Sequence, residues 1–242
     1  MAFTNSYEDK TKADSYATLA FAGTYHLAFR DLPTLIRKHV TGTTALDFGC
    51  GTGRSTRFLT SLGFTTIGVD ISNEMIDKAH TIDPDGTYLH IKEGDFHSLT
   101  DKTFDLIFSA FTFDNIPMTK KPGLFHALTT RMTANGLFIN LVSSPDLYTH
   151  EWASFTTKEF PQNKAAKTGD IVRVITTDFP DRRPVDDILC ADIDYQKLFT
   201  QARLQQIETL HPQATGQEPY HWKSETSVAP WTIYALKKKH QV

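Results

Sequence analysis

The 242-residue sequence predicts an α/β fold, a doubly wound and mostly parallel sheet. Two observations carry this prediction. Short apolar runs rich in β-branched residues alternate with helix-like patterns from about residue 30 to 142, and a glycine-rich turn follows the first run. We expect five strands along this part of the chain, at residues 44–48, 65–70, 87–93, 104–111 and 136–142.

The segments between these strands have the apolar spacing of amphipathic helices. Their apolar residues lie three or four positions apart, which places them on one face of a helix that we expect to be core. Ser72 can cap the helix after the second strand, and Pro122 suits the first turn of another. The apolar positions are Leu32, Leu35, Ile36, Phe58, Leu62, Leu124 and Leu128.

The alternation ends after residue 142. Residues 143–168 are expected to be mainly loop, and two apolar runs at 171–177 and 185–193 flank a segment rich in turn residues. This pattern predicts an inserted antiparallel hairpin.

A last helix at 195–202 and two strands at 204–210 and 231–236 follow the insert. An antiparallel hairpin at one edge would complete a seven-stranded sheet. We expect a single domain over 1–242, in which 1–40 forms an N-terminal helical segment and 143–193 an insert.

The composition excludes several classes of function. With a net charge of −3 and a pI near 6.3, the protein has no excess of positive charge to attract the phosphate backbone of nucleic acid. No apolar stretch is long enough to span a membrane, and the first residues lack the pattern of a secretory signal. The two cysteines, Cys50 and Cys190, cannot form a disulfide scaffold, so we expect a cytoplasmic protein without a membrane partner.

A glycine-rich loop follows the first strand. Gly49, Gly51 and Gly53 alternate with other residues and lead into a helix, so backbone N–H groups can approach a ligand closely. The dinucleotide fingerprint would need a glycine where Arg54 stands. Asp47 precedes the loop, and a carboxylate there repels pyrophosphate but attracts a cation.

Asp70 ends the second strand. An acid at this position binds the two ribose hydroxyls in other doubly wound nucleoside sites. The alternative is that Asp70 caps the following helix or adds charge to its first turn. Together with Asp47, it indicates a ligand with adenosine at one end and a positive charge at the other.

These motifs resemble those of class I S-adenosylmethionine-dependent methyltransferases, which have a Rossmann-like fold. They are Asp47-x-Gly49-x-Gly51-x-Gly53, Asp70 and the Gly94-Asp95-Phe96 run after the third strand. The resemblance covers residues 30–142 well, and the most similar group is the ubiquinone-biosynthesis-like one that acts on small molecules.

The resemblance implies a cofactor site for S-adenosylmethionine, with S-adenosylhomocysteine as the product. Asp47 would reach the ammonium group through water, Asp70 would bind the ribose and Ile71 would pack on the adenine. Asp95 and Phe96 would contact the adenine edge. The other residues of the implied site are Gly49, Cys50, Gly51, Gly53, Gly94, Ser109, Ala110 and Phe111; Cys50 is expected only to fit the loop, not to act as a nucleophile.

Three N-terminal residues are further candidates. Arg30 could clamp the carboxylate of the cofactor, as an arginine does in similar enzymes, or could be a surface residue. Tyr16 and Tyr25 could close over the cleft, with aromatic faces that suit a sulfonium, or could pack in the ordinary way.

The acceptor side is expected after the fourth strand, in the insert and near the C-terminus. Together with Tyr16, the candidate substrate contacts are Phe113, Asn115, Tyr220 and Trp222. A histidine is the usual general base near neutral pH, so His150 and His221 are candidates, each with the alternative of a solvated loop residue. The acids between 178 and 194 alternate in direction along the proposed hairpin, so we expect no metal site.

The predicted function is methyl transfer to a small-molecule acceptor by in-line displacement, in a monomer or homodimer. The alternatives are a regulatory protein that only binds the cofactor, a nucleic-acid or protein methyltransferase and a nicotinamide oxidoreductase. Base methylation is disfavoured because the segment Phe113-Asp114-Asn115-Ile116-Pro117 lacks the Asp/Asn-Pro-Pro-Tyr element, and nucleic acid is not an expected partner.

Overall fold

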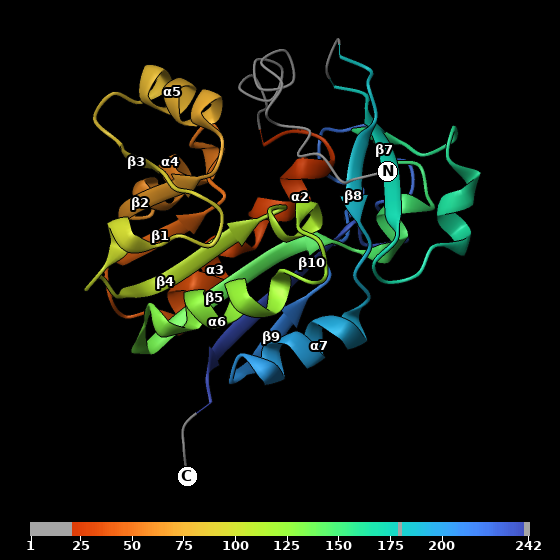
Figure 1. Cartoon of the computed structure of the whole chain (residues 1–242). Helices are drawn as coiled ribbons and strands as arrows, with labels where there is room; N and C mark the ends of the chain where they lie inside the picture. Colours follow the sequence, from red (N-terminus) through yellow and green to blue (C-terminus); the bar gives the residue numbers. More distant parts are fainter. Residues whose placement is uncertain (1–20, 179–180, 240–242) are drawn as a thin grey trace.

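A seven-stranded sheet forms the centre of the molecule (Figure 1). The computed structural model describes residues 21–178 and 181–239. The sheet strands, in chain order, are β1 (Thr44–Phe48), β2 (Thr65–Asp70), β3 (Thr87–His90), β4 (Phe104–Ala110), β5 (Met132–Ser143), β9 (Leu204–Leu210) and β10 (Trp231–Lys238).

The strand order confirms the expected doubly wound α/β sheet. It is β3-β2-β1-β4-β5-β10-β9, and β10 runs antiparallel to both of its neighbours. The chain order reverses between β1 and β4, which are parallel partners. In open α/β sheets, ligands bind beyond the carboxyl ends of the strands at this reversal.

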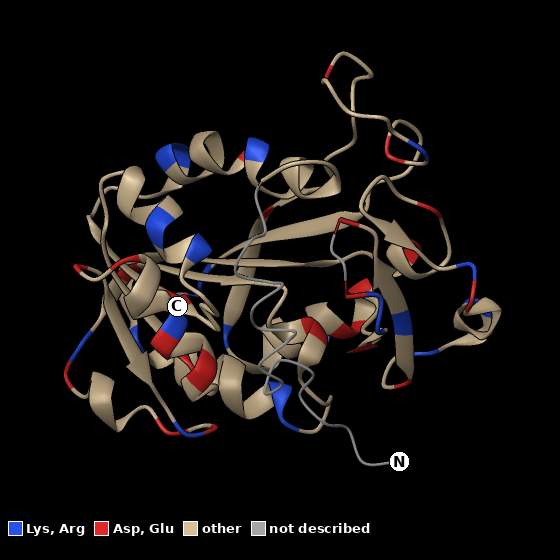
Figure 2. Ribbon diagram, turned by 90° about the horizontal axis from the view of Figure 1, so that it is seen from above, with Lys and Arg blue, Asp and Glu red and all other residues tan. Residues whose placement is uncertain are grey.

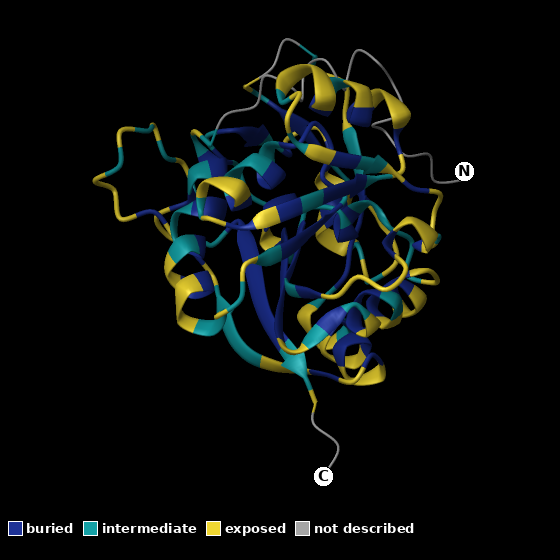
Figure 3. Ribbon diagram, turned by 90° about the vertical axis from the view of Figure 1, so that its left-hand side faces the viewer, coloured by how far each residue is buried: buried dark blue, intermediate teal, exposed yellow. Residues whose placement is uncertain are grey.

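Helices cover both faces of the sheet. The apolar side chains of α2 (Thr24–Arg30) and α3 (Leu32–His39) join one buried cluster, and those of α6 (Lys121–Thr130) and α7 (Asp192–Gln201) join another. The buried strands between the helices appear dark blue in Figure 3. The remaining sheet helices are α4 (Arg54–Ser61) and α5 (Asn73–Ile82).

Local sequence signals explain several helix boundaries. Ser72 caps α5 as expected, because its hydroxyl accepts the Met75 N–H at 3.3 Å. Pro122 lies in the first turn of α6. Asp192 and Asp194 lie in the first turn of α7, where acids favour a helix start, and this helix therefore begins before residue 195.

The insert forms a second, three-stranded antiparallel sheet. Its strands are β6 (Phe155–Thr156), β7 (Ile171–Thr176) and β8 (Val185–Ile188), in the order β6-β7-β8. The expected hairpin is therefore present, with a short third strand. Figure 1 shows this sheet beyond the carboxyl ends of β4 and β5, next to α2. Among the described residues, no helix has the length and apolar character that crossing a membrane requires.

Candidate functional site

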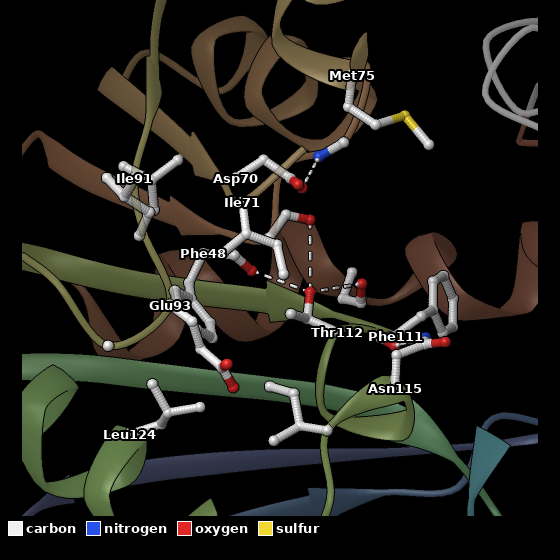
Figure 4. Close-up of a pocket in the computed structure, with 16 residues that line it drawn as sticks. Phe48, Asp70, Ile71, Met75, Ile91, Glu93, Phe111, Thr112, Asn115 and Leu124 are labelled. Atoms are coloured by element: carbon white, nitrogen blue, oxygen red, sulfur yellow. Dashed lines mark hydrogen bonds between the residues drawn. The ribbon is translucent and has the colours of Figure 1, made fainter. Parts of the chain in front are cut away.

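A pocket lies at the carboxyl ends of β1, β2 and β4, where the strand order reverses (Figure 4). The pocket together with its open mouth encloses about 850 Å³, a volume that includes open solvent. Its lining residues are Phe48, Gly49, Gly51, Val69, Asp70, Ile71, Met75, Ile91, Glu93, Gly94, Ala110, Phe111, Thr112, Asn115, Ile116 and Leu124.

The glycine-rich loop forms one wall of this pocket. Gly49, Gly51 and Gly53 all have positive φ angles, of 75°, 53° and 81°. A Cβ on Gly49 would meet the Thr112 side chain at 2.1 Å, so the close approach of the loop to the turn after β4 requires glycine there. Gly53 does not line the pocket and instead begins α4.

Asp70 presents an anchored carboxylate to the pocket. Its two oxygens accept the Gly51 N–H at 2.8 Å and the Ser72 N–H at 2.9 Å. The side chain that caps α5 is that of Ser72, so Asp70 does not have the capping role considered for it. Burial raises the pKa of Asp70, and these two hydrogen bonds counteract the shift.

Ile71 lies beside this carboxylate as an exposed apolar side chain. It is 41% exposed and lines the pocket. An apolar side chain next to a hydrogen-bonding carboxylate suits a ligand with a flat ring attached to a sugar.

Asp47 lies beneath the loop and does not line the pocket. Its Oδ2 accepts the hydroxyls of Ser55 and Thr56, both at 2.7 Å, while its buried Oδ1 has no hydrogen-bond partner among the described residues. Burial raises the pKa of Asp47 to about 6. The unpartnered oxygen fits the predicted approach of a cation through water.

Cys50 is a buried thiol in the same loop. It donates weakly to the Gly51 carbonyl at 3.6 Å, and burial raises its pKa well above the usual value. Such a thiol stays protonated and is a poor nucleophile.

The turn after β4 forms the opposite wall. Phe111 has a φ of 62°, a strained conformation for a residue other than glycine, and the residue lines the pocket. The Asn115 amide donates to the Phe111 carbonyl at 3.1 Å, which holds this turn. The Asn115 Oδ1 is buried without a hydrogen-bond partner among the described residues, so it can accept one from a ligand. Ala110 also lines the pocket, whereas the Ser109 hydroxyl is buried outside it.

The end of β3 differs from expectation. The strand stops at His90, before the predicted residue 93, so Ile91, Glu93 and Gly94 form a loop that lines the pocket. The structure does not bring Asp95 and Phe96 into the pocket. The Asp95 carboxylate accepts the His97 N–H at 2.9 Å, and the buried Phe96 ring packs on Phe48.

Arg30 and Tyr25 bind other parts of the protein. The Arg30 guanidinium forms ion pairs with Asp31 at 2.9 Å and Glu218 at 3.1 Å, and it does not line the pocket. The buried Tyr25 ring packs against the pocket residue Phe111, with 5.7 Å between ring centroids. Tyr16 lies outside the described residues.

Three segments meet beyond the carboxyl ends of the strands, and we call them the cover: α2, the insert 143–193 and the loop 211–230. Thr24 of α2 joins them. Its hydroxyl donates to Glu225 at 2.7 Å and accepts the Ser154 N–H at 3.0 Å. The Thr24 carbonyl accepts the Trp231 indole N–H at 2.9 Å, which ties the cover to β10.

The candidate acceptor residues in the cover do not reach the pocket. His150 is half-buried, with Nδ1 3.1 Å from the Asp146 carbonyl oxygen, and His221 is exposed. The Tyr220 ring packs against His26 and Trp222. Phe113 belongs to the turn after β4, and its buried ring stacks on Phe125 with 4.2 Å between ring centroids. Of the predicted acceptor contacts that lie within the described residues, Asn115 alone lines the pocket.

Sequence reasoning missed six pocket residues. Phe48 and Val69 directly precede predicted site residues, so strand-end position was an available signal. No local motif marks the others. The six are Phe48, Val69, Met75, Ile91, Glu93 and Leu124, whereas Thr112 and Ile116 belong to the segment after the fourth strand where the acceptor side is expected.

Residues 45–136 match a protein family described as "Methyltransferase domain". The match spans β1 to the start of β5 and therefore contains every residue that lines the pocket. No protein of curated function matches the sequence.

Solved structures with the same fold cover nearly the whole chain. An S-adenosylmethionine-dependent methyltransferase from Clostridium acetobutylicum is 14% identical with a TM-score of 0.62, and the match covers 93% of this chain and 94% of that one. An S-adenosylmethionine-dependent methyltransferase from Mesorhizobium loti is 18% identical with a TM-score of 0.60, covering 89% and 100%. DhpI, in a complex with SAH, is 14% identical with a TM-score of 0.61, covering 98% and 95%.

Proposed function

We propose that this chain, a class I S-adenosylmethionine-dependent methyltransferase by its methyltransferase domain and fold, transfers the methyl group to a small-molecule acceptor by in-line displacement. The observation that carries the proposal is the pocket at the carboxyl ends of β1 and β4, where the strand order reverses. The Asp70 carboxylate, the exposed Ile71 side chain and the glycine-rich loop all line it. The narrower resemblance to the ubiquinone-biosynthesis-like group stays a prediction.

The residues of the pocket fit the cofactor. Asp70 would accept the ribose hydroxyls, because each of its oxygens is held by a backbone N–H and keeps a free lone pair. Ile71 would pack on the adenine. Asp47 Oδ1 and Asn115 Oδ1, both buried and unpartnered among the described residues, would receive hydrogen bonds from the polar end of the cofactor or from water.

When bound, S-adenosylmethionine supplies a methyl group that its sulfonium makes electrophilic. The protein's part is alignment and exclusion of water. Phe111 and the glycine loop would hold the methyl-bearing end between two walls, and the cover would shield the open side. Neither His150 nor His221 lines the pocket, so the proposed mechanism uses no histidine as general base.

The charge distribution supports a small acceptor. Lys and Arg are interspersed with Asp and Glu over the view in Figure 2, and the net charge is −3. Nucleic-acid binding depends on a clustered basic surface. Cys50 and Cys190 are both free thiols, which supports our proposal of a cytoplasmic location.

Calorimetric titration with S-adenosylhomocysteine tests the cofactor site. We expect micromolar binding by the wild type and roughly 10-fold weaker binding by Asp70→Asn, because a charge-assisted hydrogen bond to ribose becomes a neutral one. The matched control is Asp77→Asn, a change of the same kind on α5 outside the pocket. Absence of binding by the wild type would overturn the proposal.

Incubation with methyl-labelled cofactor and fractionated cell extract tests the acceptor class. We expect the label in the low-molecular-weight fraction, in a form that depends on intact Asp70. Label found only in protein or nucleic acid would refute a small-molecule acceptor, and binding without any transfer would favour a regulatory role.

A further inference from the structure

A buried lysine lies beside the turn that forms one pocket wall. Lys121 is the first residue of α6 and is fully buried. Fully buried lysines are rare unless they are paired, and a cation at a helix N-terminus opposes the helix dipole. Because both the burial of Lys121 and its position at the start of a helix are unfavourable for a cation, we expect its ammonium group to make a compensating interaction.

The ammonium holds the main chain of the turn. Lys121 Nζ donates to the Phe113 carbonyl oxygen. The same oxygen accepts the Ile116 N–H at 3.4 Å, which closes the 3₁₀ turn at Phe113–Asn115. Thr112, Asn115 and Ile116, around this carbonyl, all line the pocket. Lys121 does not itself line the pocket, so its ammonium group holds the main chain at the middle of this wall from the protein interior.

Carboxylates from two other elements compensate the buried charge. Asp114 belongs to the turn, and its Oδ2 accepts both the N–H and the hydroxyl of Ser143 at the end of β5, at 3.0 and 2.9 Å. Asp187 belongs to β8 of the insert and accepts the Tyr148 hydroxyl at 3.1 Å. β8 packs against the turn at Phe113–Asn115, so the Asp114 and Asp187 carboxylates lie near the Lys121 ammonium and attract it.

The other titratable groups around Lys121 are Cys190 and Tyr195, and the ammonium lies 5.7 Å from the centre of the Tyr195 ring. Burial and the like charge of Asp187 raise the pKa of Asp114, and burial lowers the pKa of Lys121, because a buried charge loses its hydration. The attraction between opposite charges counteracts both shifts. The cluster therefore links the turn, β5 and the insert through charges that depend on one another.

We propose that Lys121 is a positioning residue for the methyltransferase site: its ammonium fixes the turn after β4 against the cofactor and couples that turn to β8 of the insert through Asp114 and Asp187. The inference rests on the proposed function, because the turn must contact the cofactor for its position to matter.

Lys121→Met tests the proposal, because it keeps the length of the side chain and removes the charge. We expect S-adenosylhomocysteine to bind roughly 10-fold more weakly by calorimetry, as a misplaced wall loses contacts with the ligand. The control is Leu204→Ala, a large-to-small change in the same buried cluster but outside the pocket. It should lower the melting temperature and leave the affinity within twofold of wild type.

Site-resolved amide hydrogen exchange separates positioning from general loss of stability. In Lys121→Met we expect faster exchange at the amides of Asn115 and Ile116 than at those of the β1 core, whereas Leu204→Ala should show no such local effect. A folded Lys121→Arg, which keeps a cationic donor, should recover most of the affinity. If the arginine and methionine variants bind equally weakly, the hydrogen bond is not the cause.

The double variant Lys121→Met/Asp187→Asn keeps the test possible if Lys121→Met alone does not fold. It removes one buried charge of each sign, so no unpaired buried carboxylate is added. We expect it to be more stable than Lys121→Met and still to bind weakly. Wild-type affinity in a folded Lys121→Met or in the double variant would overturn the inference. Failure of the wild type to bind would instead overturn the proposed function, so the two outcomes are distinguishable.

Discussion

The cofactor side of the pocket and the cover are held by different kinds of contact. On the cofactor side, backbone N–H groups hold the site: Gly51, 19 residues before Asp70, and Ser72, two residues after it, both donate to the Asp70 carboxylate. In the cover, side chains much farther apart in sequence make the contacts, as Thr24 binds Ser154 and Glu225, 130 and 201 residues away. The first kind of contact joins two motifs that the sequence displays, and the second joins residues that no motif marks.

Because the two regions are held by different contacts, we expect mutations in one to change cofactor affinity and mutations in the other to change the free energy of unfolding. Changes at the glycine loop should act mainly on cofactor affinity, because the loop forms the pocket wall. Changes inside the cover should act mainly on the free energy of unfolding, because its buried polar contacts lie outside the pocket. Four predictions test this separation, and the largest expected effect comes first.

Gly49→Ala should have the largest effect. The new Cβ would lie 2.1 Å from Thr112, in a backbone conformation with a φ of 75°, so the loop must move. We expect S-adenosylhomocysteine affinity to fall roughly 100-fold in calorimetry, or about 3 kcal/mol. Gly63→Ala is the matched control, because Gly63 also has a positive φ, of 95°, but no atom within 4 Å of the added Cβ. Equal affinities of the two variants would contradict the role of close approach.

The glycine loop and Asp70 could be predicted from sequence for a physical reason. A strand, a turn with positive φ angles and a helix start follow one another within ten residues, and each needs a particular residue type. The strands of the parallel sheet were predictable in the same way. Their ends were less so: β3 stops at His90 rather than residue 93, and Glu93 enters the pocket wall in consequence.

The contacts of the cover could not be predicted. Arg30 has the residue type of a carboxylate clamp, yet its ion-pair partner Glu218 lies far along the chain in a loop without regular structure. The Lys121, Asp114 and Asp187 cluster is hidden for the same reason, since nothing in the local sequence marks these three side chains as buried. Only the packing of the insert against the sheet brings them together.

Asp47 should give the folded protein a pH dependence of stability. Its pKa rises from about 4 to about 6 on burial, so folding favours the protonated carboxyl. Stability from this group is complete below pH 4 and is lost as the pH rises through 6, a change of about 3 kcal/mol. In cofactor-free chemical denaturation from pH 4 to 7, Asp47→Asn should gain stability relative to wild type by that amount. Parallel pH profiles of the two proteins would refute the shift.

Thr24→Val should destabilise the cover and spare the pocket. Removal of the hydroxyl leaves the buried Ser154 N–H without its acceptor and takes one hydrogen bond from Glu225, which still accepts the Ala153 N–H; we expect a cost of about 2 kcal/mol. Chemical denaturation should show this loss, while S-adenosylhomocysteine affinity stays within twofold of wild type. Thr130→Val is the control, because the Thr130 hydroxyl binds only within an exposed helix end. A parallel loss of affinity in Thr24→Val would mean that the cover and the cofactor side are coupled.

Arg30→Ala should have the smallest effect, and it separates the two roles considered for this residue. The Arg30 ion pairs with Asp31 and Glu218 are partly exposed, so their loss should cost less than about 1 kcal/mol of stability. We expect unchanged S-adenosylhomocysteine affinity in calorimetry, because the guanidinium is held by the protein and lies outside the pocket. A tenfold loss of affinity with an intact fold would show instead that Arg30 leaves Glu218 to bind the cofactor carboxylate. Arg37→Ala on α3 serves as the control for removing a positive charge.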